Sequence, residues 1–262
     1  MSDHTTPRGT VLVTGGGKRV GKAFALGLAQ DGWDVVVHHN TSAGPAEAVA
    51  DQIRSLGRRA ATVGGDLGDP DAVARVVPDA VAALGPLTAL VNNASVFERD
   101  TAGSMTRDSW TFHQEINLAA PVFLAQAFYQ QLPVDRRGAI VNMIDHQVLR
   151  PTPGYFSYTI SKCALWSATQ MLAMALRPRV RVNGIGPGLT LPSGPQTETE
   201  FAAEHARTPL KVGPTEADLL QALRYLLDAP TVTGQMIAVN GGAHLMAYRE
   251  AEGPDSMGTG LE

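Results

Sequence analysis

The sequence lacks the features that cross-link small secreted domains or anchor a chain in a membrane. Its 262 residues include one cysteine, Cys163, so an internal disulfide is excluded. No Cys/His cluster has the spacing of a zinc site, so no metal is expected. The longest mostly apolar run, 118–128, is too short to span a bilayer, and the first ten residues lack the apolar stretch of a signal peptide. We therefore expect a cytoplasmic protein with no membrane partner.

An excess of positive charge is also missing. The 21 basic residues are outnumbered by 25 acidic ones, which gives a formal net charge of −4. This balance offers no polycationic face to neutralise a phosphate backbone, so no nucleic-acid partner is expected. What the chain does have is 44% hydrophobic residues, enough for one large core.

Short apolar runs alternate with longer amphipathic stretches, which predicts an α/β fold: a single-domain, Rossmann-type, doubly wound parallel sheet with helices on both faces. The expected strands are 10–14, 34–38, 60–64, 87–91, 139–144, 180–185 and 235–239. The expected helices are 19–30, one starting at 42–45, 70–84, 106–132 with a kink or break at Pro121, 158–176 and 216–227.

The catalytic domain is expected to cover 9–248, after an N-terminal arm at 1–8. The stretch 189–210 is rich in Pro, Thr and Ser and has weak periodicity, so we interpret it as a mobile substrate loop inserted in the fold. The polar tail 249–262 favours disorder or an arm on a neighbouring subunit.

A glycine cluster follows the first expected strand and opens the first helix. Glycines at 15, 16, 17 and 21 let the backbone turn tightly and approach a pyrophosphate, whose charge the helix N-terminus favours. A strand–turn–helix corner can also need glycine for steric reasons alone. The order of elements at the start of the fold favours a dinucleotide site.

The end of the second strand indicates which dinucleotide binds. An NAD site places an acid there, whereas this chain has His38-His39-Asn40-Thr41-Ser42. Arg19 could face the same pocket and bind a 2′-phosphate, although a solvated charge at a helix start is the plainer interpretation. We therefore predict NADP(H). A metal at the histidine pair is not expected, because adjacent strand residues point to opposite faces.

Tyr158 and Lys162 lie four residues apart, on one face of an expected helix. A nearby ammonium lowers the pKa of a phenol, which would make Tyr158 a usable proton donor or acceptor near neutral pH. This spacing is common by chance. Its position after the fifth strand of a nucleotide-binding pattern makes it informative.

These motifs, with Asp66-Leu67, Asn92-Asn93-Ala94, Asn117 and 183–188 in the same order, resemble the short-chain dehydrogenase/reductase family over about residues 9 to 245. The resemblance implies catalytic roles for Tyr158, which delivers the proton, for Lys162, which also binds the nicotinamide ribose, and for Asn117, which holds a relay water. It also implies a homotetramer, with Trp166 and 171–174 in a helix–helix interface. The expected cofactor contacts are Gly15, Gly17, Lys18, Arg19, Val20, Gly21, His39, Asn40, Thr41, Ser42, Asp66, Leu67, Asn93, Ala94, Ser95, Tyr158, Lys162, Pro187, Gly188, Leu189 and Thr190.

Two departures from the family pattern narrow the resemblance. Asp145 stands where the family usually has serine, and Arg19 stands where the turn usually has its middle glycine. Together with the stretch 93–97, these two residues give the chain a resemblance to pteridine reductases and to bacterial dihydromonapterin or dihydrofolate reductases of the same family. That likeness implies that Phe97 stacks on a pterin ring, that Ser95 contacts ligand or cofactor, and that Asp145 joins the catalytic set.

We therefore predict an NADPH-dependent enzyme that reduces a C=N bond of a pterin, with Ser95, Phe97, Asp145 and Tyr158 at the substrate. One alternative is a carbonyl reductase of the same family acting on a ketone or 3-oxoacyl substrate. A further alternative is a non-catalytic, NADP-binding regulatory protein. Plainer interpretations also stay open: Asp145 as a tolerated strand-end acid, Phe97 as a core aromatic, and Cys163 as a small core residue. His146, Gln147 and Tyr155 are weaker candidates for substrate contact.

Overall fold

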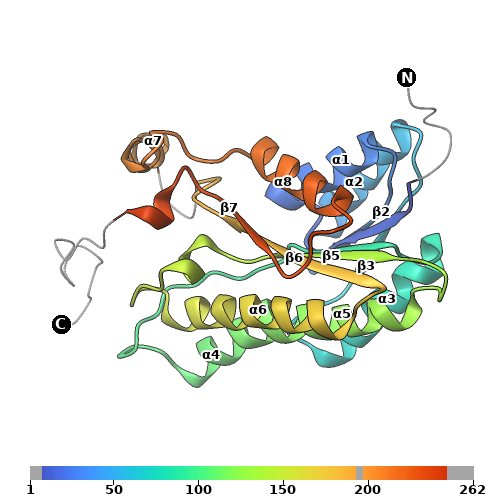
Figure 1. Ribbon diagram of the computed structural model, residues 1–262, viewed down its shortest axis with the longest axis horizontal. Coiled ribbons are helices and arrows are strands. Elements are labelled where there is room, and N and C mark those ends of the chain that lie inside the picture. Colours follow the sequence, from blue (N-terminus) through green and yellow to red (C-terminus); the bar gives the residue numbers. More distant parts are fainter. Residues whose placement is uncertain (1–7, 193–196, 247–262) are drawn as a thin grey trace.

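The chain forms one parallel sheet of seven strands in a computed structural model that describes residues 8–192 and 197–246. The strand order is β3-β2-β1-β4-β5-β6-β7 (Figure 1). The strands are β1 Thr10–Val13, β2 Asp34–His39, β3 Ala60–Gly64, β4 Ala89–Asn92, β5 Gly138–Met143, β6 Val180–Pro187 and β7 Met236–Val239.

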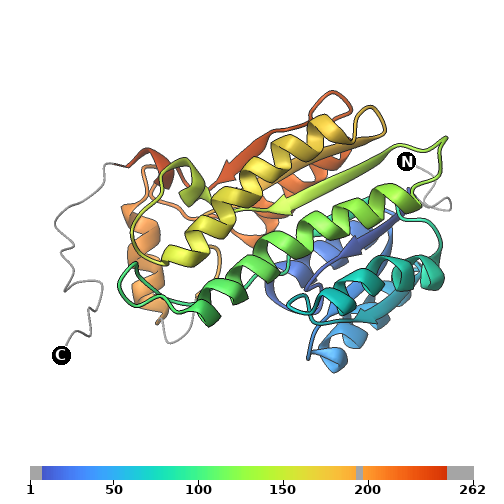
Figure 2. The ribbon, with the colours of Figure 1, turned by 90° about the horizontal axis from the view of Figure 1, so that it is seen from below.

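Helices cover both faces of the sheet (Figures 1 and 2). One layer contains α1 Arg19–Gln30, α2 Ala43–Ser55 and α8 Glu216–Asp228. The other contains α3 Pro70–Leu84, α5 Ala120–Gln131 and α6 Phe156–Ala175. The chain also forms α4 Arg107–Gln114, α7 Glu198–Arg207, the π-helical turn η1 Glu115–Ala119, and the 3₁₀ turns η2 His146–Leu149 and η3 Ala243–Leu245.

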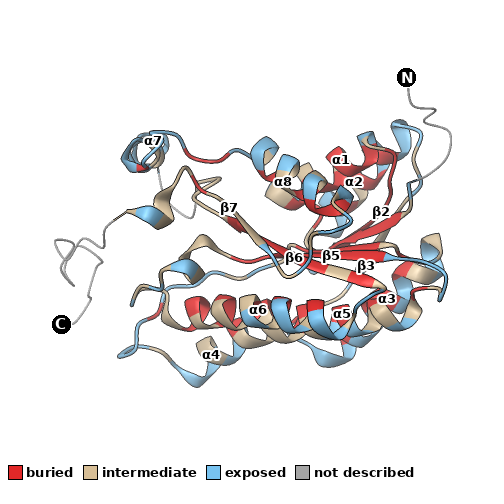
Figure 3. Ribbon diagram, viewed as in Figure 1, coloured by how far each residue is buried: buried red, intermediate tan, exposed pale blue. Residues whose placement is uncertain are grey.

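The apolar strands are buried on both faces, as a doubly covered sheet requires. In β1, Val11 and Val13 pack with the α1, α2 and α8 layer, whereas Leu12 between them packs with the other layer. This alternation follows from the two-residue period of a strand. Figure 3 shows the strands as mostly buried ribbon between helices whose outer surfaces are exposed. The predicted fold class is confirmed.

The structure confirms the break predicted in one helix and corrects one predicted loop. The stretch 106–132 is divided by η1, because Pro121 has no amide hydrogen to donate to the preceding turn. The break expected there is thus confirmed. The stretch 189–210, predicted to be a loop, contains α7, which begins with a capping box formed by Thr197 and Glu200.

Strand order reverses between β1 and β4, so the loops after these two strands diverge to opposite sides and leave a crevice at their carboxyl ends. The sequence motifs gather at this edge. In the described part of the chain, none of the helices is both long and apolar enough to cross a membrane. Most of the predicted arm, 1–8, and all of the predicted tail, 249–262, lie outside the described residues.

Candidate active site

The glycine turn lies directly after β1, and steric contacts account for its glycines. Gly15 has a φ of +62°, in the left-handed region that favours glycine. A Cβ atom on Gly21 would lie 2.2 Å from the carbonyl oxygen of Gly15, so no side chain fits at that position. The tight turn expected from the sequence is therefore present, and the close approach of its backbone explains its composition.

His38, near the end of β2, braces this turn. The amide of Gly15 donates to Nδ1 of His38 at 3.2 Å, so Nε2 carries the ring hydrogen and donates to the carbonyl of Gly65 at 3.0 Å. Burial lowers the pKa of His38 from 6.5 to about 4. The ring is therefore neutral near pH 7, with a fixed tautomer. Sequence analysis missed this role.

The N-terminus of α1 suits an anionic ligand. Its N-cap residue, Lys18, makes no side-chain capping bond, and its first turn contains no acidic residue. The first amides of a helix lack partners within the helix and carry its positive dipole end. The residues present therefore fit a dinucleotide pyrophosphate. The contacts expected from Gly15, Gly17, Lys18, Val20 and Gly21 stay predictions.

Asn93 and Ala94 follow β4 and tie it to β1. Their amides donate to Oγ1 of Thr14 at 2.9 and 3.0 Å, and Nδ2 of Asn93 donates to the Thr14 carbonyl at 2.9 Å. The expected floor of the cofactor site thus lies beside the glycine turn.

The residues expected at the adenosine end follow β2 and β3, which are neighbours in the sheet. His39 is paired with Gly64, and its Nδ1 lies 2.8 Å from the carbonyl of Asn40. Asp66 accepts a hydrogen bond from the Gly68 amide at 2.9 Å. Contacts between a nucleotide and this corner stay a prediction for His39, Asn40, Thr41, Ser42, Asp66 and Leu67.

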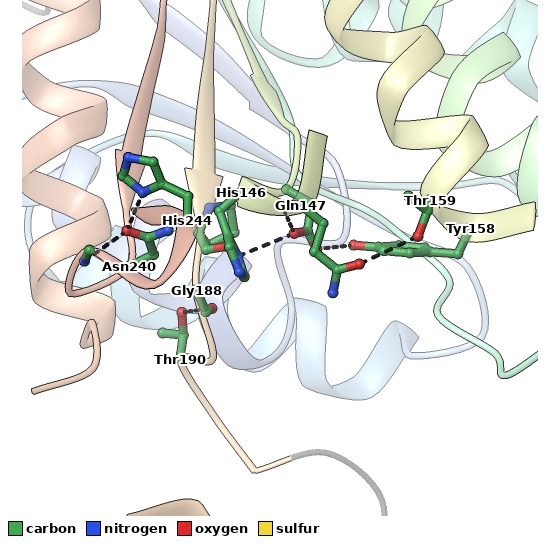
Figure 4. Close-up of polar contacts among 11 residues, drawn as sticks. His146, Gln147, Tyr158, Thr159, Gly188, Thr190, Asn240 and His244 are labelled. Carbon is green, nitrogen blue, oxygen red and sulfur yellow. Dashed lines mark hydrogen bonds and ion pairs between the residues drawn. The ribbon is translucent and has the colours of Figure 1, made fainter. Parts of the chain in front are cut away.

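Asp145, Tyr158 and Lys162 come together at the carboxyl end of β5, beside Gln147 (Figure 4 labels Tyr158 and Gln147). The phenol of Tyr158 donates to Oδ2 of Asp145 at 2.7 Å, and Oδ1 accepts from the Gln147 amide at 2.8 Å. Nζ of Lys162 lies 5.8 Å from the Tyr158 ring centroid and donates to the carbonyl of Met143 at 2.9 Å. Tyr158 and Lys162 are both buried.

The protonation equilibria differ from the prediction. Lys162 was expected to lower the pKa of Tyr158. Instead, burial and then the charge of Asp145 raise the pKa of Tyr158 well above 10.0. Burial lowers the pKa of Lys162 to about 8, although Asp145 acts in the opposite direction. The prediction is wrong for the chain alone, because the phenol is buried and donates to the Asp145 carboxylate, while the ammonium is bonded to the backbone. Tyr158 is therefore a protonated donor at neutral pH.

Asn117 lies in η1 and is completely buried. Its Oδ1 accepts from the Val96 amide at 2.9 Å and from the Ser95 hydroxyl at 3.0 Å. Its Nδ2 donates to the Val96 carbonyl at 3.0 Å and to Oγ of Ser161 at 3.2 Å. Asn117 thus holds the segment after β4 against α6. Its place in a proton relay with Lys162 stays a prediction.

Phe97 forms an aromatic wall beside the proton donor. Its ring stacks on Tyr155 with centroids 4.1 Å apart and meets Tyr158 edge-on at 4.7 Å. These rings border a cavity of about 530 Å³ whose lining includes Asp145 and Lys162. The site therefore offers a flat apolar surface next to a phenol and a carboxylate.

The segment after β6 forms another wall of this cavity. His146 donates from Nδ1 to the Pro187 carbonyl at 2.8 Å, and the same nitrogen lies 3.3 Å from Oδ1 of Asp145. Thr190 donates to the Gly188 carbonyl at 3.0 Å (Figure 4). From α7, Nε2 of His205 donates to the Leu189 carbonyl at 2.7 Å. The segment predicted to be a loop therefore contributes a helix that supports the site.

The side chain of Arg19 extends to the segment after β6. Both of its terminal nitrogens donate to the carbonyl of Pro192 at 3.2 Å. Arg19 lines the 530 Å³ cavity, whereas 39–42 are absent from the described lining. The contact of Arg19 with a 2′-phosphate beside His39 stays a prediction.

A buried polar cluster next to the site was also missed. Asp100 lies in the loop after β4, His113 in α4 and Ser157 in α6, and all three are at most 4% exposed. The available signal was the spacing of His113 and Asn117, four residues apart on one helical face. Within residues 8–192 and 197–246, this cluster included, no three His, Cys, Asp or Glu side chains gather as a metal site.

Comparison with known proteins agrees with this geometry. Residues 9–203 match the short chain dehydrogenase family. A FolM alternative dihydrofolate reductase 1 of Brucella canis, crystallised with NADP, is 41% identical, with a TM-score of 0.90 over 95% of this chain and 98% of that one.

Two further relatives cover most of the chain. An uncharacterized oxidoreductase of Mycobacterium tuberculosis is 34% identical over 88% of this chain and 90% of its own length. A 3-oxoacyl-[acyl-carrier-protein] reductase FabG of Staphylococcus aureus is 28% identical over 90% and 98%. The glycine turn after β1, the buried Tyr158–Lys162 pair and the extent of these matches agree: the chain belongs to the short chain dehydrogenase family.

Proposed function

We propose that the chain reduces a C=N bond in a pterin of the dihydrobiopterin, dihydromonapterin or dihydrofolate type. The observation that carries this proposal is the hydrogen bond from Tyr158 to Asp145 beside the ring of Phe97. The similarity of the chain to the FolM structures of Brucella supports the same substrate class. Whichever substrate it takes, the chain is an NADP-dependent short-chain oxidoreductase.

The bound cofactor supplies the hydride, and the side chains manage the proton. Reduction of a C=N bond adds a hydride to carbon and a proton to nitrogen. Tyr158 holds that proton on a phenol oxygen that is buried at the cavity edge. Lys162, with a pKa of about 8, is mostly cationic at neutral pH and contributes positive charge beside the phenol. The ring nitrogen is the acceptor that this arrangement suits.

Asp145 favours a nitrogen heterocycle over a carbonyl substrate. A carboxylate accepts hydrogen bonds from the N–H groups at the edge of a pterin ring. Carbonyl reduction develops negative charge on oxygen, and an ionised carboxylate at the same place would oppose that charge. A serine hydroxyl, which the family usually has there, would donate to it instead.

The first test is a substrate panel. NADPH oxidation would be followed with dihydropterins and dihydrofolate, and in parallel with ketones and 3-oxoacyl thioesters. We expect turnover of the pterins. Activity confined to carbonyl compounds would reject the pterin assignment and favour the carbonyl reductase suggested by the FabG relative. Tight NADPH binding with no turnover on the panel would favour a regulatory protein.

The second test exchanges the residue that carries the proposal. Asp145→Ser should lower kcat/KM for the dihydropterin about 100-fold, because it removes a group at the proton-transfer site, and should spare or improve ketone reduction. Asp135→Ser, which changes an exposed acid in the turn after α5, is the matched control and should leave both activities unchanged. Equal losses on both substrate classes would contradict a pterin-specific role for Asp145.

A further inference from the structure

We propose that His113, together with Asp100 and Ser157, is a positioning residue that fixes the Phe97 ring against Tyr158, and that it does so as a neutral imidazole with hydrogen on Nδ1. The inference rests on the proposed function only in naming a pterin as the molecule that Phe97 contacts. Its geometry stands on the described residues alone.

The segment that carries Phe97 is anchored at alternate residues. Val96 is bonded through both its amide and its carbonyl to Asn117 in η1. The amide of Glu98 donates to Nε2 of His113 in α4 at 3.1 Å. Asp100 accepts at Oδ1 from the Ser157 amide, at the start of α6, at 2.9 Å. Phe97 therefore lies between two anchored residues, so its backbone has little freedom to move.

Hydrogen-bond chemistry determines the state of His113. A backbone amide can only donate, so Nε2 must carry the lone pair, and Nδ1 then donates to Oγ of Ser157 at 2.7 Å. Oγ of Ser157 in turn donates to Oδ2 of Asp100. Although burial raises the pKa of Asp100, hydrogen bonds from Ser157 and Ser109 hold it below its usual range. His113, Ser157 and Asp100 are thus linked to one another and to the Glu98 amide by hydrogen bonds.

This set resembles a Ser–His–Asp hydrolase site in composition, but its geometry excludes that chemistry. His113 and Ser157 are completely buried, so no substrate can reach the hydroxyl. The direction of donation is also wrong, because the serine donates to the carboxylate rather than to the imidazole. What the cluster does contact is the catalytic element: the ring of His113 lies 6.0 Å from that of Tyr158, which follows Ser157 in α6.

The two rings that the cluster connects form one wall. Phe97 is fixed by anchors on both sides of it in the chain, and Tyr158 is fixed by the first turn of α6. Their edge-on contact has centroids 4.7 Å apart. Loss of the Glu98–His113 bond would release Phe97 without touching cofactor or substrate. A loosened wall weakens substrate binding more than the proton transfer itself.

The test compares His113→Leu with His113→Gln, which keeps one donor and one acceptor. His113→Leu should raise KM for the dihydropterin about tenfold, change kcat less than about threefold, and leave the Kd for NADPH within about twofold. His113→Gln should recover part of the KM. Thr111→Ala, at an exposed position of α4, is the matched control. A loss confined to kcat, or an equal loss of NADPH affinity, would overturn the proposal.

A double-mutant cycle with Phe97→Ala shows whether His113 acts through that ring. In the Phe97→Ala background, His113→Leu should change KM less than about twofold, because the wall is already gone. Additive effects would overturn the proposal. If the enzyme reduces ketones instead of pterins, the cycle is measured on the ketone, so the substrate assignment can fail while the coupling is still determined.

Amide hydrogen exchange needs no substrate, so it tests the proposal even if a variant is inactive. Amide hydrogen exchange of the peptide 95–101 should be at least about tenfold faster in His113→Leu than in the native chain, with α1 unchanged. Unchanged exchange in 95–101 would overturn the proposal. Exchange that is faster everywhere would show that the variant is globally destabilised, and the His113→Gln result would then decide.

Discussion

Arg19, in the glycine turn after β1, has a backbone conformation that is unfavourable for a residue with a side chain. Its φ is +49°, in the left-handed region, which costs a non-glycine residue about 1–2 kcal/mol. The guanidinium reaches the Pro192 carbonyl and the catalytic cavity from this position. A glycine would be the easier residue for the backbone, but it would lack these contacts of the guanidinium.

Arg19→Gly should therefore separate stability from function. We expect the free energy of unfolding to rise by about 1 kcal/mol, since the left-handed backbone becomes favourable. NADPH affinity or substrate KM should worsen, because the side chain that lines the cavity is lost. Urea denaturation and NADPH titration measure the two effects.

Arg19→Ala is the control, because it removes the guanidinium but keeps the backbone cost. It should share the functional loss without the gain in stability. Native affinity and KM in Arg19→Gly would contradict a role for the side chain in the site.

Arg181 connects two elements far from the site. It lies at the second residue of β6 and donates to the carbonyls of Leu226 and Leu227, in the last turn of α8, at 2.6 and 2.7 Å. A cation there satisfies carbonyls that the helix leaves without partners and opposes the negative end of its dipole. Within β6, the lining of the catalytic cavity begins at Pro187, which lies six residues and about 20 Å further along the same strand.

Arg181→Met should lower the free energy of unfolding by about 2 kcal/mol, because charge-assisted hydrogen bonds from a half-buried guanidinium to the carbonyls of buried residues are lost. The distance from the site predicts a native kcat at 25 °C. Urea denaturation and steady-state kinetics check the two statements. Arg75→Met, at an exposed position of α3, should change neither. A lower kcat in Arg181→Met would mean that β6 transmits the change to its carboxyl end.

Elements with local signals were predictable from the sequence. The helices α1 and α3 begin and end at the predicted residues; α3 is capped by Asp69, whose side chain accepts from the Asp71 amide. In α7, the capping box of Thr197 and Glu200 was present in the sequence, but few apolar residues follow it and none is buried in the helix. Hydrophobic periodicity identifies helices that cover a core, and α7 does not cover one.

At the scale of the whole molecule, the sequence predicts which residues gather at the site, but it does not predict which of their atoms form hydrogen bonds. Motifs after β1, β4, β5 and β6 must meet, because parallel strands end at one edge of the sheet. Which atom bonds to which depends on side chains from elements far apart in sequence. The raised pKa of Tyr158 follows from its burial among such elements and, after that, from its contact with Asp145. The interface predicted for a tetramer stays a prediction, with Met171 and Met174 exposed on α6.

His38 links this site to the stability of the whole chain, because it bonds the turn after β1 to the end of β3. Burial lowers its pKa from 6.5 to about 4. The unfolded chain therefore takes up a proton first, so lowering the pH favours unfolding. The contribution of His38 is fully present above pH 6.5 and is lost as the pH falls towards about 4, at up to about 1.4 kcal/mol per pH unit.

Over that window the native chain should lose about 3 kcal/mol of unfolding free energy through this one group. His38→Gln should flatten the loss, although it lowers stability at pH 7, where the native hydrogen bonds are intact. Urea denaturation of both chains at half-unit steps from pH 7 to 4 measures the difference. Asp34 and Asp100, whose pKa values are lowered, lose their contributions below this range and affect both chains equally. A difference between the two chains that does not change with pH would mean that His38 is not held neutral against the turn.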